Sequence, residues 1–323
     1  MSDSLRVVVT GASGFVGARL LSTLCNSGKF NVTSILRSRS SSHEKMLDEF
    51  TVESIGPQTS YGRLFDGVDS VVHLAARVHV MNEYSEDPLR DFREVNVFGT
   101  VNLARQAASA GVRRFIFISS VKVSGERTEQ GRPFVEAMRS NPEDAYGQSK
   151  FEAEEALKEI AKETGMEVVI IRPPLVYGPG VKANFRSLIS LCNTGFPLPF
   201  GSIHNRRSLI YVDNLVDFIL YCISHPAAAN ETFLVSDRED VSIAALISRI
   251  RKLQGRRSFL LPVPTSLFTF AGRLTGKTEV VSRLVSDLSV DSTKASQLLD
   301  WTPPYSLDRG LQNTVAHYLH EET

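Results

Sequence analysis

Three residues of the chain have the types and spacing that proton transfer requires: Ser120, Tyr146 and Lys150. Tyr146 and Lys150 lie four positions apart within Asp144–Thr164, a predicted helix, so both should project from one helix face. A tyrosine with its ordinary pKa of about 10 is a poor catalyst at neutral pH, but a nearby cation lowers that pKa. Ser120 could orient a carbonyl or hydroxyl oxygen. The trio suits oxidation and reduction at a carbinol–ketone centre, although a Y-x-x-x-K pair also occurs on ordinary surface helices.

The residues that could hold a redox cofactor lie near the N-terminus. Leu5–Val9 is a predicted buried strand, Thr10–Gly17 has the spacing G-x-x-G-x-x-G, and Val16, Leu20 and Leu24 recur at helical spacing. Backbone N–H groups and the positive end of a helix can hold a pyrophosphate at such a turn. The sequence therefore predicts a dinucleotide site, with a plain strand-to-helix turn as the alternative.

Arg37 bears on the choice of cofactor. It follows the second predicted strand, Asn31–Leu36, and lies twenty residues after Gly17. An acidic residue near this position binds the ribose 2′-hydroxyl of NAD, whereas an arginine suits the 2′-phosphate of NADP. The sequence favours NADP(H) and leaves NAD(H) possible. The alternative is a solvated basic loop from Arg37 to His43.

Strands that alternate with helices predict an α/β fold with a Rossmann-type, doubly wound parallel sheet. Further strands are expected at Phe50–Ile55, Ser70–Leu74, Arg114–Ser119 and Glu167–Ile171, with a helix at Asp87–Ala110. We expect His73, at the end of one strand, to be a packed core histidine rather than a catalyst.

Beyond Arg172 the pattern changes, because prolines and glycines interrupt regular structure. Ser208–Val212 and Thr232–Val235 are expected to return to the sheet. These features predict a dinucleotide-binding domain at 1–172, with returning segments near 208–236. A smaller, mostly helical substrate lobe would comprise 173–207 and 237–323. The polar stretch Ser124–Ala145 predicts a long loop that forms the substrate pocket with this lobe.

Composition excludes several classes of protein. The 323 residues contain 36 Lys and Arg and 36 Asp and Glu, so net charge gives no case for a nucleic-acid partner. No apolar run is long enough to span a membrane, and no signal peptide is evident. Cys25, Cys192 and Cys222 are scattered, which argues against a metal site and fits a cytoplasmic protein.

As a set, nine stretches resemble the extended short-chain dehydrogenase/reductases, the nucleotide-sugar epimerase/dehydratase family. They cover nearly the whole chain: Thr10–Gly17, His73–Ala76, Asn96, Ser119–Ser120, Tyr146–Lys150, Arg172–Pro173, Val176–Gly180, Arg207–Asn214 and Trp301–Pro303. The resemblance implies that Ser120, Tyr146 and Lys150 are catalytic. The turn, the argument for Arg37 and the resemblance together predict a cofactor site of Gly11, Ser13, Gly14, Phe15, Val16, Gly17, Arg37, Leu74, Ala75, Ala76, Ser119, Tyr146, Lys150 and Pro173. Substrate would be bound by Ser120, Asn184, Arg207 and Arg283, the last three at the nucleotide diphosphate.

Within that family, His73–Met81 and Ser119–Glu126 are most similar to bacterial reductases of a UDP-2-acetamido-2,6-dideoxy-hexos-4-ulose. The implied function is reduction of the 4-keto group of this UDP-sugar for surface-polysaccharide synthesis. The alternatives are a UDP-glucose or UDP-N-acetylglucosamine 4-epimerase that holds NAD tightly and, remotely, a non-catalytic dinucleotide sensor. Arg37, and Ser124 where relatives commonly have tyrosine, favour the reductase. The family resemblance also implies a homodimer.

Overall fold

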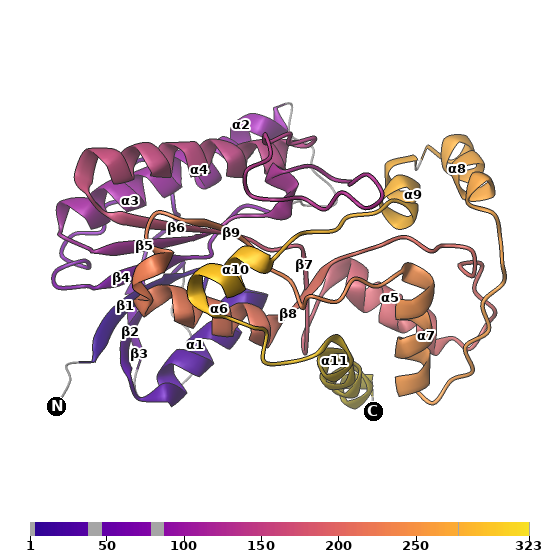
Figure 1. The fold of residues 1–323 in the computed structure, drawn as a ribbon. Helices are drawn as coiled ribbons and strands as arrows, with labels where there is room; N and C mark the ends of the chain where they lie inside the picture. The colour runs from indigo at the N-terminus through magenta and orange to yellow at the C-terminus, as the bar shows by residue number, and fades with distance from the viewer. Residues whose placement is uncertain (1–3, 38–46, 79–86, 277, 323) are drawn as a thin grey trace.

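The computed structural model describes residues 4–37, 47–78, 87–276 and 278–322. A sheet domain occupies the left of Figure 1 and a smaller, helix-rich lobe the right. None of the helices in these ranges is long and apolar enough to cross a bilayer.

Seven parallel strands form the main sheet, in the order β3-β2-β1-β4-β5-β6-β9. Their bounds are β1 Leu5–Thr10, β2 Phe30–Leu36, β3 Leu47–Thr51, β4 Ser70–His73, β5 Arg114–Ile118, β6 Glu167–Arg172 and β9 Thr232–Leu234. Every residue of β4 and β5 is buried, as expected for a parallel sheet covered by helices on both faces. The predicted Rossmann-type fold is confirmed.

Helices cover both faces of the sheet (Figure 1). On one face α1 (Phe15–Ser27) and α6 (Val212–Ser224) pack against alternate strand residues. On the other face α3 (Thr100–Ser109) and α4 (Ala145–Thr164) pack against the intervening ones. The predicted helix Asp87–Ala110 consists of three consecutive pieces: α2 (Pro88–Arg93), a π-helical segment η1 (Glu94–Gly99), and α3.

One of the two expected returning strands belongs elsewhere. Thr232–Leu234 does pair with β6 as the last strand of the main sheet. Leu209–Tyr211, however, is β8 and pairs with β7 (Leu175–Tyr177) in a separate two-stranded sheet, so the prediction for Ser208–Val212 was wrong. A short apolar run has β character but contains no information about which sheet it joins.

The smaller lobe has its own core, built from helices α5, α7 and α11 and from the two-stranded sheet. Its helices are α5 Ala183–Asn193, α7 Ile243–Leu253, α8 Thr265–Leu274, α9 Thr278–Val285 and α11 Leu307–Glu322. Helix α10 (Thr293–Leu299) lies in the range expected for this lobe but packs against the main-sheet core. The Ser124–Ala145 stretch is an irregular segment whose Phe134 pairs with Val290.

Candidate functional site

The glycine-rich turn follows β1 and is closed too tightly for side chains. Gly11 has φ +70°, and a Cβ there would lie 2.6 Å from the backbone N of Ala75. A Cβ on Gly17 would lie 2.1 Å from the carbonyl oxygen of Gly11. The N–H of Gly14, the N-cap of α1, donates to that same oxygen at 2.9 Å. A glycine-rich turn that ends at a helix N-terminus, as this one does at α1, is the kind of backbone that binds a pyrophosphate.

The end of β4 forms the other wall of this crevice. Thr10 Oγ1 accepts a hydrogen bond from the N–H of Ala75 at 3.1 Å, so Leu74–Ala76 lies beside Gly11. The strand order reverses between β1 and β4, which is where open α/β sheets bind ligands. Of the other predicted residues, Ser13 is exposed, while Phe15 and Val16 pack on the core of the smaller lobe. The residues present fit a dinucleotide.

Arg37 is exposed directly after β2, at the position expected to read the adenosine ribose. The rest of the predicted basic loop, residues 38–43, lies outside the described residues.

The carboxyl end of β5 brings the predicted catalytic residues to the same edge of the sheet. Lys150 is 1% exposed, and its Nζ donates to the carbonyl oxygen of Ile118 at 2.8 Å. Its ammonium also lies 4.4 Å from the centroid of the Phe117 ring. Tyr146 is half-buried one turn earlier on α4, with its ring edge-on to Phe92 at 6.1 Å.

Ser120 begins the short 3₁₀ turn η2 (Val121–Val123), and its Oγ accepts from the N–H of Lys122 at 3.2 Å. The N–H of Val121 donates to the carbonyl oxygen of Pro173 at 3.0 Å, which places Pro173 beside Ser120. Gly147 fits closely below this turn, because a Cβ there would lie 2.8 Å from the carbonyl oxygen of Lys122. The serine segment and the start of α4 are therefore in direct contact.

The electrostatics of Tyr146 differ from the prediction. Burial, and then the charge of Asp144, raise the pKa of Tyr146 above its ordinary value, so a lowering by Lys150 is not found. Burial likewise lowers the pKa of Lys150 to about 7, against an opposing effect of Glu154. The physical reason is that burial removes the ammonium of Lys150 from water, which disfavours its charged form.

Glu154, which the sequence analysis did not single out, lies one turn after Lys150 and is fully buried. Its carboxylate accepts hydrogen bonds from Arg172 Nε at 2.9 Å and from Arg172 Nη2 at 2.5 Å. Ser119, predicted to contact the cofactor, donates its hydroxyl to Glu154. The cluster joins α4 to the ends of β5 and β6. Its spacing Tyr146, Lys150, Glu154 along one helix face was the signal that could have revealed it.

Asn96, in the π-helical segment η1, forms hydrogen bonds both with the segment that follows β4 and with α4. Its side-chain oxygen accepts from the N–H of Arg77 at 2.8 Å. Its amide nitrogen donates to the carbonyl oxygen of Arg77 and to Ser149 Oγ, both at 3.0 Å. This buried residue therefore helps to hold the Lys150 segment against the crevice.

The predicted loop and the smaller lobe enclose a cavity of about 290 Å³, lined in part by Glu126, Asp144 and Arg283. Asp144 caps α4 by accepting from the N–H of Gly147 at 2.7 Å, and it forms an ion pair with Lys122. Lys122 also pairs with Glu126 at 2.9 Å, and Glu126 with Arg283 of α9 at 3.0 Å. Charged groups thus connect the start of α4 to α9 of the smaller lobe.

Arg207 and Arg283, two of the predicted diphosphate ligands, lie together. Arg207 Nη1 donates to the carbonyl oxygen of Arg283 at 2.8 Å, and burial lowers the pKa of Arg207. Asn184, the third, is exposed in the first turn of α5, after Ala183 with φ +52°. Across the described residues, no hydrogen bond or ion pair joins Asn184 to either arginine.

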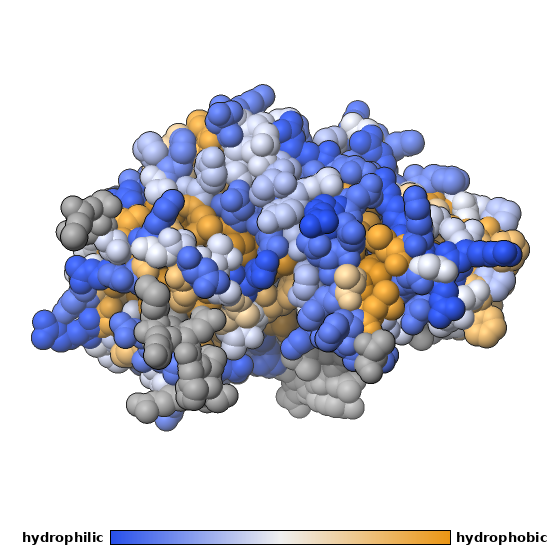
Figure 2. Space-filling model, turned by 90° about the horizontal axis from the view of Figure 1, so that it is seen from below, coloured by the Kyte–Doolittle hydropathy of each residue, from blue (hydrophilic) through white to orange (hydrophobic). Residues whose placement is uncertain are grey.

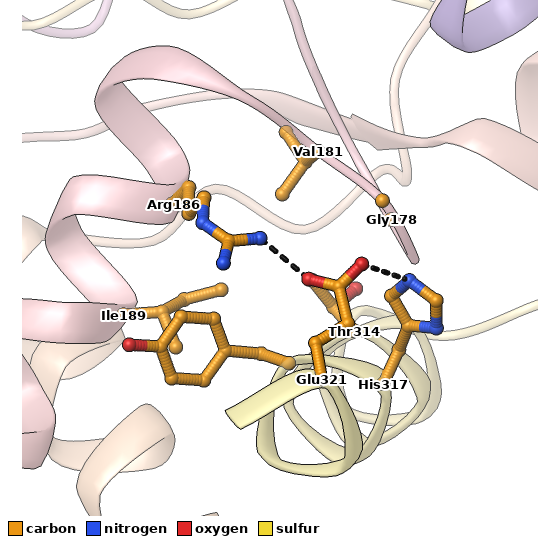
Figure 3. Close-up of a pocket in the computed structure, with 9 residues that line it drawn as sticks. Gly178, Val181, Arg186, Ile189, Thr314, His317 and Glu321 are labelled. Atoms are coloured by element: carbon orange, nitrogen blue, oxygen red, sulfur yellow. Dashed lines mark hydrogen bonds and ion pairs between the residues drawn. The ribbon is translucent and has the colours of Figure 1, made fainter. Parts of the chain in front are cut away.

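Figure 3 shows a different pocket, between α5 and α11, where Arg186 and His317 both contact Glu321. Its volume is about 10 Å³, enough for one water molecule at most. None of the predicted site residues lines it. In the described parts of the chain, no cluster of His, Cys, Asp and Glu could hold a metal ion.

His73 is the packed histidine that the sequence predicted. Its Nδ1 lies 2.6 Å from Thr10 Oγ1 and its Nε2 lies 2.9 Å from Thr100 Oγ1. Burial, with a smaller effect of Lys150, lowers the pKa of His73 to about 3.

His73→Gln tests this environment. Below pH 6.5 the unfolded chain binds a proton at His73 that the folded protein excludes, so stability is lost as the pH falls. Between pH 7 and pH 5 this group should cost about 2 kcal/mol of unfolding free energy. Urea unfolding at both pH values should show that loss in the native protein and in the exposed-histidine control His204→Gln, but not in His73→Gln. An equal pH dependence in all three proteins would contradict the prediction.

Comparison with known proteins fits this geometry. A model of the NAD dependent epimerase/dehydratase family matches residues 7–236. The chain is 46% identical over 314 residues to a UDP-glucose 4-epimerase of Vibrio cholerae, covering 97% of this chain and 95% of that protein. It is 29% identical to the N-acetyl-alpha-D-glucosaminyl-diphospho-ditrans,octacis-undecaprenol 4-epimerase of Escherichia coli O157:H7, covering 98% of this chain and 96% of that one.

Solved structures share the fold. The UDP-glucuronic acid 4-epimerase of Bacillus cereus, in complex with NAD, superimposes with a TM-score of 0.77 at 21% identity. The UDP-glucose 4-epimerase of Thermotoga maritima, with UDP-glucose, gives 0.77 at 23% identity. Each comparison covers 99% of this chain and 100% of the other. From the family model and the 46% identical relative, this chain belongs to the NAD-dependent epimerase/dehydratase family.

Proposed function

We propose that the protein is a UDP-sugar 4-epimerase that uses NAD, with UDP-glucose or UDP-N-acetylglucosamine as substrate. The observation that supports this most strongly is the 46% identity, over nearly the full length, to a protein named UDP-glucose 4-epimerase. The position of Ser120, Tyr146 and Lys150 at the carboxyl end of β5 supports the same chemistry. This reverses the order of preference suggested by the sequence, which placed the 4-ketoreductase first.

Tyr146 would take the proton from O4 of the sugar as the C4 carbinol becomes a ketone, and return it when the carbinol re-forms. Ser120 would hold O4 by a hydrogen bond throughout, and Lys150 would hold the ribose of the cofactor. NAD bound at the glycine-rich turn would supply the redox chemistry, which is reversible hydride acceptance at C4 of the sugar. Because both half-reactions use one proton site, Tyr146 must act as base and then as acid.

Arg207 and Arg283 would hold the diphosphate, since guanidinium groups can grip phosphate oxygens through paired hydrogen bonds. In this structure Arg283 pairs with Glu126, and that ion pair would have to open for phosphate to bind. Asn184 would contact the diphosphate from α5. A homodimer built on α3 and α4 and a cytoplasmic location also stay as proposals.

The decisive experiment supplies the purified protein with UDP-glucose and, separately, UDP-N-acetylglucosamine, and follows the 4-epimers by chromatography. We expect interconversion with no added cofactor, and NAD that stays with the protein through gel filtration. Failure with both substrates, together with stoichiometric NADPH oxidation by a UDP-linked 4-keto sugar, would replace the epimerase with the reductase.

That reductase is the second candidate, and Arg37 is the observation that favours it. An exposed arginine at the end of β2 suits the 2′-phosphate of NADP, and a reductase must exchange its cofactor at every turnover.

Arg37→Ala should therefore lower the affinity for NADPH relative to NADH. A charge-assisted hydrogen bond contributes about 1.5–3 kcal/mol, which corresponds to a change of roughly tenfold or more in the ratio of dissociation constants. Fluorescence titration of both cofactors measures the ratio, with Arg63→Ala as a matched exposed control. An unchanged ratio would show that Arg37 does not select the cofactor.

A further inference from the structure

One part of the smaller lobe contains basic residues and no acidic ones. Residues 241–278 contain seven Lys and Arg and no Asp or Glu, although the whole chain has formal net charge zero. The segment comprises α7, residues 254–264, which we call the strap, and α8. They run along the right-hand end of the molecule in Figure 1.

Helix α8 in this segment turns an apolar face toward solvent, whereas a helix of a monomeric domain normally turns its apolar face toward the core. It packs inward through Gly272 and through Phe268, whose ring stacks on Phe200 at 5.8 Å. Leu267, Phe270 and Leu274 are 55%, 61% and 72% exposed. They are three and four residues apart, so they lie on one face of the helix. This face has the apolar pattern of a buried helix but is exposed to solvent.

The apolar surface continues from α8 onto the strap. Phe259 and Leu261 are exposed there, and Phe196 is exposed on the neighbouring loop. The N–H of Leu261 donates to the carbonyl oxygen of Leu198, and the N–H of Leu198 donates to that of Phe259. These bonds and the bridge between Leu198 and Leu260 hold the two segments together. In Figure 2 the same end of the molecule, at the right, mixes hydrophobic and hydrophilic surface.

Several cations of the segment have no acidic partner. Lys252, Arg256, Arg257 and Arg273 are exposed, and no carboxylate of the described residues forms an ion pair with any of them. By contrast Arg249 pairs with Glu239 and Asp308. Unpaired cations around exposed Phe and Leu side chains are complementary to an anionic surface with an apolar interior.

We propose that α8 and the strap dock the protein onto a lipid bilayer that contains anionic headgroups. The apolar stripe would lie at the level of the acyl-chain boundary, and the arginines would contact the headgroups. Charge complementarity favours this occupant over a second copy, because two such basic faces would repel. The aliphatic and phenyl side chains favour lipid over nucleic acid. The sequence prediction of no membrane partner rested on spanning length, which a helix lying on the surface does not need.

The experiment is sedimentation of the full-length protein with vesicles. We expect binding to vesicles of phosphatidylcholine and phosphatidylglycerol, little binding to phosphatidylcholine alone, and release by high salt. One variant combines Leu267→Ser, Phe270→Ser and Leu274→Ser, and a second combines Arg256→Gln, Arg257→Gln and Arg273→Gln. Each should lower the partition constant by at least about tenfold.

Matched controls lie elsewhere on the surface. Leu298→Ser removes an exposed apolar side chain of α10, and a combined Lys29→Gln, Arg63→Gln and Arg105→Gln removes three exposed cations. These variants should sediment like the native protein. Thermal melts and enzymatic turnover will test whether the docking variants are folded. The vesicle result does not depend on which reaction the protein catalyses.

Three outcomes would overturn the proposal. The first is that the native protein does not sediment with either kind of vesicle, or that the docking variants and controls bind equally. The second is a native oligomer, measured by light scattering, that the apolar variant alone dissociates, since a second copy would then cover the face. The third is that the native protein binds polyuridylate but not vesicles, and that the apolar variant still binds polyuridylate.

Discussion

Tyr146→Phe is expected to lower kcat by about 10²- to 10⁴-fold, the usual contribution of a positioned acid–base group. The variant keeps the ring against Phe92 but has no hydroxyl to exchange a proton with the sugar. Cofactor binding and thermal stability should change little, because no hydrogen bond of this hydroxyl holds the described part of the fold together. Turnover, cofactor titration and a thermal melt together measure the three effects.

Tyr221→Phe is the matched control, since Tyr221 is an exposed tyrosine of α6. It should retain full activity. If Tyr146→Phe also retained turnover within about threefold, the acid–base role of the phenol would be wrong. A non-catalytic sensor would instead show no turnover in the native protein and unchanged cofactor binding in the variant.

Glu154→Leu is expected to lower the unfolding free energy by about 3–5 kcal/mol. It leaves the guanidinium of Arg172 buried without a counter-charge and removes the acceptor of Ser119. The same change removes the carboxylate that raises the pKa of Lys150, so that pKa should fall further and less of the lysine would be charged at neutral pH. Urea unfolding and the pH dependence of kcat measure the two effects.

A double variant separates charge from packing. Arg172→Met in the Glu154→Leu background removes both charges and should recover part of the lost stability, because an apolar pair of similar volume often replaces a buried ion pair well. Glu163→Leu is the surface control, since its pair with Arg105 is exposed and should be worth about 1 kcal/mol or less. If Glu154→Leu lowered the unfolding free energy no more than Glu163→Leu does, the Glu154–Arg172 ion pair would not be important for holding α4 against β6.

The structure also changes the account of how the phenol is activated. The sequence places Tyr146 and Lys150 on one helix face, and from that alone a lowered tyrosine pKa follows. The folded environment adds two effects that spacing does not contain: burial of both groups, and the carboxylate of Asp144 at the start of the same helix. Burial of the phenol and the charge of Asp144 raise the pKa of Tyr146, and burial of Lys150 lowers the pKa of the lysine.

Local patterns determined a large share of this protein. The apolar run, the glycine turn and the 3.6-residue periodicity after it specify β1, the turn and α1, because each is set by neighbours in the chain. The same holds for Tyr146 and Lys150 on α4, where Asp144 caps the helix and Gly165 ends it. Strands alternating with helices then leave few arrangements other than a parallel sheet.

Only the tertiary structure decided which distant groups meet. Leu209–Tyr211 has strand character in the sequence, but its pairing with β7 rather than β6 depends on residues more than thirty positions away. Sequence periodicity likewise does not predict the Glu154–Arg172 pair or the chain of ion pairs from Asp144 to Arg283. It also does not predict that the apolar face of α8 is exposed. Periodicity reports which face of an element is apolar. Whether that face finds a partner, and whether a buried charge finds its opposite, is settled by the packing of the whole chain.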